Sequence, residues 1–315
     1  MYPQILMDQH NLIIILGATA SGKTKLAVQV AHALNGEIIS ADSRQVFKRM
    51  DIGTGKDLQE YTIEETTIPY HLIDILEPGE RYHVDAFKND FYQAFDEISK
   101  HGKLPVLCGG TGMYMHSLLQ NQAFTAIPVN QVLRDELDLL TKEELVLQLQ
   151  SDTDQNTQHV NLSSKKRLIR ALEIAAYLKE NELETINRPV LKPLIFGLKN
   201  EVEVTRAKIL ERLEARFNAG LIEEVQQLLQ SGIDKEMLIF YGLEYKFIVN
   251  YLDGQLTLAE LKLRLGIAIC QYAKRQNTFF RKMEKDSVNI IWLDASLSVN
   301  QLKQLVLQKV SASFN

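Results

Sequence analysis

Short apolar runs alternate with amphipathic segments along the N-terminal part of the chain. The runs are NLIIIL (11–16), GEIISAD (36–42), IPYHLIDI (68–75) and KLPVLCGGTG (103–112). Runs of this length, rich in aliphatic and β-branched residues, are typical of buried parallel strands. Between them, KTKLAVQVAHALNG predicts a helix that ends at Gly36, and DAFKNDFYQAFDEISK (85–100) places its phenylalanines on one helical face. Strands that alternate with helices predict an α/β fold with a doubly wound parallel sheet.

The alternation stops after residue 120, where helical patterns continue without a clear strand. KPLIFGLK (192–199) restores a strand, an amphipathic stretch over 202–230 predicts one long helix with Gly232 as its stop, and NIIWLD (289–294) predicts a late strand. The pattern therefore predicts a core in two parts, interrupted by a helical insertion. The predicted parts are 1–120, 121–190 and 191–315.

Composition narrows the class of protein. The formal net charge of −5 over 315 residues argues against a protein that coats nucleic acid by bulk charge, although it allows a local basic groove. The two cysteines, Cys108 and Cys270, form no C-x-x-C pair, which disfavours a structural zinc site and a disulfide framework. The N-terminus lacks the features of a signal peptide, and no apolar run approaches the ~18 residues of a membrane span. We expect a cytoplasmic, monomeric protein.

The stretch GATASGKT follows the first predicted strand and opens the first predicted helix. It matches the phosphate-loop pattern G-x-x-x-x-G-K-[ST], in which glycines let backbone N–H groups converge on an anion at a helix N-terminus. The lysine adds charge, and the threonine hydroxyl can bind Mg²⁺. The candidate phosphate-binding residues are Gly17, Ala18, Thr19, Ala20, Ser21, Gly22, Lys23 and Thr24, with Thr24 as the metal ligand. The pattern is typical of ATP-binding and other nucleotide-binding proteins, but it indicates phosphate and not a particular nucleotide.

Two further stretches end at the same predicted sheet edge. Asp42, in ISADSRQ, follows the second strand, and Thr111, in CGGTG, follows the strand over 103–112. Ligands of open parallel sheets bind at the carboxyl ends of the strands, so Asp42 can serve as a base or metal ligand. The alternatives are a cap for a following helix at Asp42 and a tight strand-to-helix turn at Thr111.

The chain lacks part of the set of residues that proteins use to hydrolyse ATP. The strand VLCGG ends in glycine where an ATPase usually carries a Mg²⁺-binding aspartate, and Asp74 in HLID is a weak substitute. No arginine-rich lid stands out. The loop is therefore better suited to holding phosphates than to hydrolysing ATP.

Basic residues gather in two segments, SSKKRLIRALE (163–173) and YAKRQNTFFRK (272–282). Basic and aromatic side chains together suit RNA phosphates and bases, although solvated helix faces give the same pattern. Arg216, in ERLEARFNAG, is a further candidate because a guanidinium suits phosphate oxygens. The sequence alone favours a surface ion pair of Arg216 with Glu211 or Glu214.

Six stretches, in matching order, resemble those of the tRNA dimethylallyltransferases, also called tRNA isopentenyltransferases. The stretches are GATASGKT, ADSRQVFKRMDIGTGK, CGGTGMY, KRLIRALE, ARF and AKRQNTFFR. The resemblance runs nearly from end to end, and the T-A-S-G-K-T core is narrower than the general phosphate-loop pattern.

The resemblance implies transfer of a dimethylallyl group from dimethylallyl diphosphate to N6 of the adenosine just 3′ of the anticodon in tRNA. The loop would then hold a departing diphosphate, with help from Mg²⁺ and Arg216. Asp42 matches the family's base, and Thr111 would orient the amine or a donor oxygen. The positions expected to contact the tRNA anticodon loop are Asp42, Ser43, Arg44, Gln45, Thr111, Arg134, Lys166, Arg167, Leu168, Ile169, Arg170, Lys274 and Arg275.

Several positions depart from the family pattern and bear on fine specificity more than on reaction type. They are Gly55, Asp57, Leu243, Ile269, Cys270 and the block HVNLSSKKR.

Three other functions stay open at this point. A small-molecule kinase or NTPase would use the same loop. Prenylation of free adenine nucleotides would need neither the insertion nor the basic segments. An RNA-binding protein with a vestigial site would not need Lys23, Thr24, Asp42 and Thr111.

Overall fold

The computed structural model describes residues 9–120, 123–151, 164–183 and 187–312. The chain divides into two compact units. One comprises Met1–Leu119 with Pro189–Asn315, and the other is Gln120–Arg188. Each unit is described by itself below.

The larger unit is built on a six-stranded sheet in the order β5-β2-β6-β1-β7-β8, in which every neighbouring pair is parallel. The strands are β1 (Leu12–Gly17), β2 (Gly36–Ala41), β5 (Tyr70–His71), β6 (Leu104–Gly109), β7 (Pro193–Lys199) and β8 (Ile291–Asp294). At the centre, Ile14 of β1 is aligned with Leu107 and Ile195 on either side. The parallel α/β sheet predicted from the apolar runs is confirmed.

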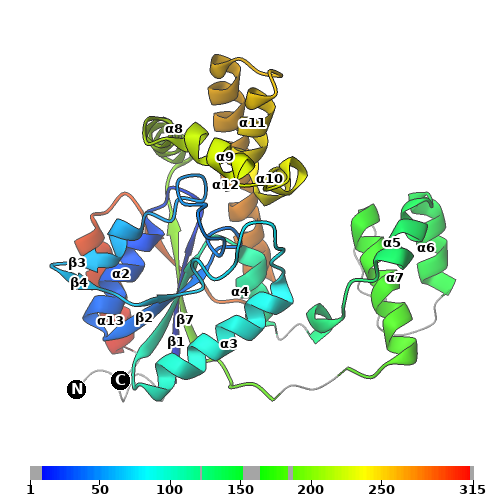
Figure 1. The fold of residues 1–315 in the computed structure, drawn as a ribbon. Helices are drawn as coiled ribbons and strands as arrows, with labels where there is room; N and C mark the ends of the chain where they lie inside the picture. The colour runs from blue at the N-terminus through cyan, green and yellow to red at the C-terminus, as the bar shows by residue number, and fades with distance from the viewer. Residues whose placement is uncertain (1–8, 121–122, 152–163, 184–186, 313–315) are drawn as a thin grey trace. The chain divides into compact units, whose positions relative to one another are not determined.

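Both faces of this sheet are covered by helices (Figure 1). Side chains alternate along a strand, so Ile13 and Ile15 pack in one buried cluster while Ile14 packs in the other. The first cluster includes Leu26 of α2 (Lys23–Ala33) and Val306 of α13 (Val299–Ala312). The second cluster includes residues of α3 (Val84–Lys100) and α4 (Gly112–Leu119). This two-sided burial explains why the β1 run is apolar throughout.

Two predicted elements differ from the structure. The run over 68–75 forms only the short strand β5, because Leu72 and Asp74 adopt φ values of +63° and +56°, which a strand does not tolerate. The predicted helix over 202–230 is two helices, α8 (Val202–Asn218) and α9 (Leu221–Gln230). Gly220 separates them with a φ of +98°.

The remaining elements of the larger unit lie between and after these. They are the 3₁₀ helix η1 (Leu58–Tyr61), the hairpin strands β3 (Thr62–Ile63) and β4 (Thr66–Thr67), α10 (Lys235–Tyr241), α11 (Leu243–Leu252) and α12 (Leu258–Lys285). Helix α12 begins at a capping box, in which Thr257 and Glu260 satisfy each other's backbone N–H groups. None of the helices in the described residues is long and apolar enough to cross a membrane.

The smaller unit contains the 3₁₀ helix η2 (Ala123–Ala126) and the helices α5 (Gln131–Asp138), α6 (Lys142–Ser151) and α7 (Lys165–Glu180). Its core is a small leucine-rich cluster that includes Leu145 and Leu168, both fully buried. The described part of the segment is helical, as the sequence pattern predicts.

Candidate active site

The phosphate loop joins β1 to α2. Its tight path requires small residues, because a Cβ on Gly17 would lie 2.6 Å from the Ser21 hydroxyl and 3.2 Å from the carbonyl oxygen of Leu198. Ala20 and Gly22 both adopt positive φ values, +61° and +82°. These conformations bring the loop to the N-terminus of α2, where free backbone N–H groups favour an anion.

Gln276, on α12, is hydrogen-bonded to the phosphate loop. Its side-chain oxygen accepts a hydrogen bond from the backbone N–H of Thr19 at 2.9 Å. Its amide donates to the carbonyl oxygen of Gly110 at 2.9 Å, and the side chain is buried. The phosphate loop and the glycine turn after β6 are therefore fixed to one side chain.

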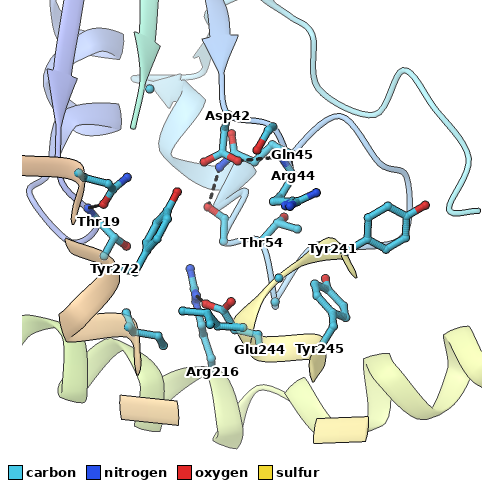
Figure 2. A pocket seen from close by; sticks show the side chains of 18 of the residues that line it. Thr19, Asp42, Arg44, Gln45, Thr54, Arg216, Tyr241, Glu244, Tyr245 and Tyr272 are labelled. Atoms are coloured by element: carbon cyan, nitrogen blue, oxygen red, sulfur yellow. Dashed lines mark hydrogen bonds and ion pairs between the residues drawn. The ribbon is translucent and has the colours of Figure 1, made fainter. Parts of the chain in front are cut away.

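A cavity of about 510 Å³ opens beside the loop. Its size is typical of a site for a small molecule. Figure 2 shows Thr19 on one side of it, Arg216 and Glu244 on another, and Asp42 and Arg44 facing them. Loop, strand-end and C-terminal helix residues therefore line a single space.

Lys23 and Thr24 reach this cavity from the start of α2. Burial lowers the pKa of Lys23, while the nearby Cys108 and Asp42 oppose that shift. Burial raises the pKa of the Cys108 thiol to about 12, and the neighbouring Thr24 hydroxyl opposes that shift. A diphosphate bound beside Lys23 would oppose the effect of burial and favour the charged ammonium.

Asp42 lies at the carboxyl end of β2. Its carboxylate accepts a hydrogen bond from the backbone N–H of Arg44 at 2.9 Å, so it caps a turn and not a helix. Thr111 stands behind it: its hydroxyl accepts from the N–H of Ser43 at 3.3 Å, and its own N–H donates to the carbonyl oxygen of Ala41 at 3.2 Å. Asp42 lines the cavity, whereas Thr111 supports the turn that carries it.

Arg216 approaches the cavity from α8. Its side chain is largely buried, and burial followed by the neighbouring Arg212 guanidinium lowers its pKa. One terminal nitrogen lies 3.4 Å from the carboxylate of Glu244, while the buried Nε has no hydrogen-bond partner in the described part of the chain. The expected surface pair with Glu211 or Glu214 is wrong, because the Arg216 side chain is largely buried and pairs with Glu244 of α11, while Glu214 pairs with Lys262.

The arrangement brings a phosphate loop, a lysine and a buried arginine to the same space as a carboxylate. Such a space can hold a diphosphate beside a base. The family model described as IPP transferase matches residues 45–283, and one described as Isopentenyl transferase matches residues 10–79.

The chain belongs to the IPP transferase family. A curated relative from Phocaeicola vulgatus, named tRNA dimethylallyltransferase 2, is 46% identical over 96% of this chain and 98% of its own length. One from Geotalea uraniireducens, named tRNA dimethylallyltransferase 1, is 48% identical over 90% and 92%. The crystal structure of a tRNA isopentenylpyrophosphate transferase from Bacillus halodurans superposes with a TM-score of 0.69 at 32% identity, covering 96% and 97% of the two chains. The resemblance seen in the six motifs is confirmed.

This IPP transferase holds its loop over 43–57 through a buried carboxylate. Glu224 accepts hydrogen bonds from the backbone N–H groups of Asp51, Ile52 and Gly53 at 2.8, 2.6 and 3.0 Å. It also accepts one from the Tyr245 hydroxyl at 2.9 Å. Four donors on one carboxylate fix the wall of the cavity that contains Gly53 and Thr54.

Some of the departures from the family pattern have structural consequences here. A Cβ on Gly55 would lie 1.7 Å from a terminal nitrogen of Arg216, and Asp57 forms an ion pair with Arg212. Leu243 and Ile269 line the cavity with apolar surface. Cys270 is half-buried and does not line the cavity, and nothing in the structure explains it. Residues 159–163 of the HVNLSSKKR block lie outside the described residues.

The predicted RNA-contacting residues of the larger unit divide into two sets. Ser43, Arg44, Gln45 and Arg275 line the cavity, whereas Lys274 is exposed on α12 away from its lining. Gln45 is occupied within the protein, since its amide donates to the carbonyl oxygen of Gly55 at 3.1 Å. Arg44 and Arg275 are therefore the predicted RNA-contacting cations of the larger unit that line the cavity.

In the smaller unit the predicted RNA contacts have structural partners. Arg134 and Arg170 both pair with Glu173, at 2.9 and 2.5 Å, and Glu173 is almost fully buried. Leu168 and Ile169 are buried in the core of this unit, so the prediction of RNA contact does not apply to their side chains. Lys166 and Arg167 are exposed on α7 and stay candidates.

Several lining residues are not among the site residues predicted from the sequence. They include Tyr61, Cys108, Arg212, Glu244, Tyr272 and Gln276. Arg212 precedes Arg216 by one helical turn on α8, and that spacing was a usable signal. Tyr272 belongs to the predicted basic and aromatic segment 272–282, and it does line the cavity. Glu244 reaches the cavity through tertiary packing, which no local pattern reveals.

Thr24 is the predicted Mg²⁺ ligand. No group of three or more acidic, histidine or cysteine side chains suited to a metal exists among the described residues. Mg²⁺ commonly uses one or two protein groups and completes its shell with phosphate oxygens and water. The Thr24 hydroxyl at the cavity wall, with Asp42 nearby, fits that mode.

Proposed function

We propose that this IPP transferase transfers a dimethylallyl group from dimethylallyl diphosphate to N6 of the adenosine 3′-adjacent to the anticodon in tRNA, releasing diphosphate. The observation that carries the proposal is the presence of Asp42 and the phosphate loop in one cavity. The names of the curated relatives support the substrate pair. We place the reaction in the cytoplasm, with a monomeric enzyme.

Asp42 would act as the base. An adenine amino group is a weak nucleophile because its lone pair is delocalised into the ring, so its proton must leave as the new C–N bond forms. The hydrogen bond from the Arg44 N–H holds the carboxylate in place, and Thr111 holds the turn. The proton moves from N6 to the Asp42 carboxylate.

The diphosphate would lie between the loop and Arg216. The bond from the allylic carbon to oxygen breaks, and its electron pair passes to the diphosphate. The negative charge on the diphosphate therefore increases. Lys23, the loop N–H groups and Arg216 stabilise that charge, and the low exposure of the Arg216 side chain strengthens its interaction. Mg²⁺, held at Thr24, would supply further positive charge to the phosphate oxygens.

The adenosine would enter from the side of Arg44 and Tyr241. It must leave its stack, at a cost of a few kcal/mol that is smaller in a single-stranded loop than in a duplex. An anticodon loop meets this requirement. The cavity of about 510 Å³ offers room for an extruded base.

The test is mass spectrometry of tRNA nucleosides after incubation with the protein, Mg²⁺ and dimethylallyl diphosphate. We expect a dimethylallyl adduct on N6 of one adenosine and release of diphosphate. Transfer to free adenosine monophosphate but not to tRNA, or release of inorganic phosphate from ATP with no adduct, would overturn the proposal.

A further inference from the structure

An exposed aromatic ring with two arginines lies beside the cavity mouth. Phe240, at the end of α10, is 46% exposed. The guanidinium carbons of Arg44 and Arg81 each lie 5.3 Å from the centroid of its ring. This distance is that of a cation–π contact, which holds both guanidinium groups near one ring. We call these three residues the mouth cluster.

The mouth cluster is fixed from beneath by Tyr241. That residue is fully buried, and its ring centroid lies 4.3 Å from that of Phe47. Its hydroxyl accepts a hydrogen bond from the N–H of Gly79 at 2.6 Å and donates one to the carbonyl oxygen of Glu80 at 2.7 Å. The turn that carries Arg81 is therefore anchored to the residue next to Phe240, so the cluster is formed before any ligand arrives.

The position of the cluster is defined by its neighbours. Arg44, Ile239 and Tyr241 all line the cavity. The N–H of Arg44 donates to the Asp42 carboxylate, and Figure 2 shows Arg44 between Asp42 and Tyr241. The cluster thus borders the side where the acceptor would enter, while the phosphate loop and Arg216 occupy the other side.

A polyanion with flat bases fits this surface better than an apolar partner does. Two guanidinium groups favour phosphate oxygens, and an exposed ring offers a face or edge to a nucleobase. The acidic side chain on the same turn, Glu80, accepts a hydrogen bond from the N–H of Glu77 at 2.9 Å and is engaged there. Glu80 keeps its negative charge, so the two guanidinium groups of Arg44 and Arg81 outnumber one carboxylate at this place, although the chain as a whole is acidic.

We propose that Arg44, Phe240 and Arg81 bind the nucleotide that flanks the reacting adenosine, with the arginines on its phosphate and Phe240 against its base. This rests on the proposed function, since it assumes an RNA acceptor. It assigns binding roles to Phe240 and Arg81, two residues outside the catalytic set. The cluster would hold the chain on one side of the extruded base while Asp42 receives that base.

The experiment measures binding of a fluorescent anticodon stem-loop RNA to the full-length protein without dimethylallyl diphosphate, over a series of salt concentrations. Arg81→Gln should weaken binding about tenfold and reduce the slope of log affinity against log salt by about 0.7, the value for one phosphate contact on a single strand. Phe240→Leu removes the ring but no charge, so it should weaken binding about tenfold with the slope unchanged.

Arg264→Gln is the matched control, because Arg264 is an exposed arginine on α12 that pairs with Glu260 and does not line the cavity. It should leave affinity and slope as in the wild type. Equal effects of Arg81→Gln and Arg264→Gln, or wild-type binding by both cluster variants, would overturn the inference. If the wild type binds RNA as described but transfers no allyl group, the proposed function fails and not the cluster.

Discussion

Gln276 of α12 accepts a hydrogen bond from the backbone N–H of Thr19, with 2.9 Å between the two atoms. The residues are separated by 257 positions in sequence. The same side chain donates to the carbonyl oxygen of Gly110. The shape of the phosphate loop in this protein therefore depends on a helix near the other end of the chain.

Gln276→Ala should impair binding of dimethylallyl diphosphate. The substitution leaves the Thr19 N–H and the Gly110 carbonyl without their partner, at a cost of about 1–3 kcal/mol for a buried group. We expect the KM for dimethylallyl diphosphate to rise about tenfold, measured by transfer assay at saturating tRNA. Thr278→Ala is the control, because Thr278 is exposed and bonds to groups of α12 itself. Equal KM values for the two variants would contradict the positioning role.

Asp42→Asn should remove the base while keeping the hydrogen bond that positions the side chain. The asparagine oxygen can still accept the hydrogen bond from the Arg44 N–H, but the side chain cannot take a proton from N6. We expect the single-turnover rate of transfer to fall by about 10²–10⁴-fold, the usual contribution of a general base. Affinity for dimethylallyl diphosphate, measured by calorimetry, should change less than threefold. A variant that keeps wild-type turnover would remove Asp42 from the role of base.

The sequence predicted the elements whose burial is uniform. The β1 run is apolar because both of its faces are covered, and α3 buries its phenylalanines along one side. The sequence did not predict where a strand or helix ends when a single residue with a positive φ value ends it. Leu72 and Gly220 have positive φ values, and the first belongs to an apolar run that looks like a strand.

The candidate site was predictable where function requires a local motif. The loop from Gly17 to Thr24 and Asp42 at the end of β2 follow from sequence and sheet geometry together. The sequence does not predict the surroundings of Arg216, because its partner, Glu244, belongs to a different helix and only the folded structure shows that the arginine is buried. Gln276 lay inside a quoted motif, but its role depends on where α12 packs.

As pH rises, binding of the diphosphate should begin to weaken at a lower pH than it would if Lys23 had an ordinary lysine pKa. In the free protein, burial lowers the pKa of Lys23 below the ordinary lysine value of 10.5, and a bound diphosphate favours the charged ammonium. Above that lowered pKa, binding must take up a proton, so affinity falls as pH rises. Cys108 and Tyr272, with pKa values raised to about 12, titrate later.

Calorimetry with inorganic diphosphate, across the neutral to alkaline range, measures this dependence. Lys23→Arg should bind more weakly at neutral pH but lose the alkaline fall, because a guanidinium stays charged there. An alkaline fall of the same size in the variant would show that another group controls it.

Glu224→Gln should destabilise the protein more than its small chemical change suggests. The carboxylate accepts from three backbone N–H groups and from the Tyr245 hydroxyl, two donors on each oxygen. A glutamine amide would turn its own N–H groups toward two of these donors. We expect the free energy of unfolding to fall by about 3 kcal/mol, the upper range for a hydrogen bond to a charged group. Tyr245→Phe removes one donor and should cost about 1 kcal/mol.

Urea unfolding of these variants checks the expectation, with Glu223→Gln as the control. Glu223 is exposed on the same helix, so its replacement should change stability by less than about 0.5 kcal/mol. Because the Glu224 contacts also fix Gly53 in the cavity wall, Glu224→Gln should raise the KM for dimethylallyl diphosphate or tRNA at temperatures where it remains folded. If Glu224→Gln and Glu223→Gln unfold at the same urea concentration, the Glu224 carboxylate does not anchor the loop. The conformation of residues 51–53 must then come from the packing of Ile52 and its neighbours.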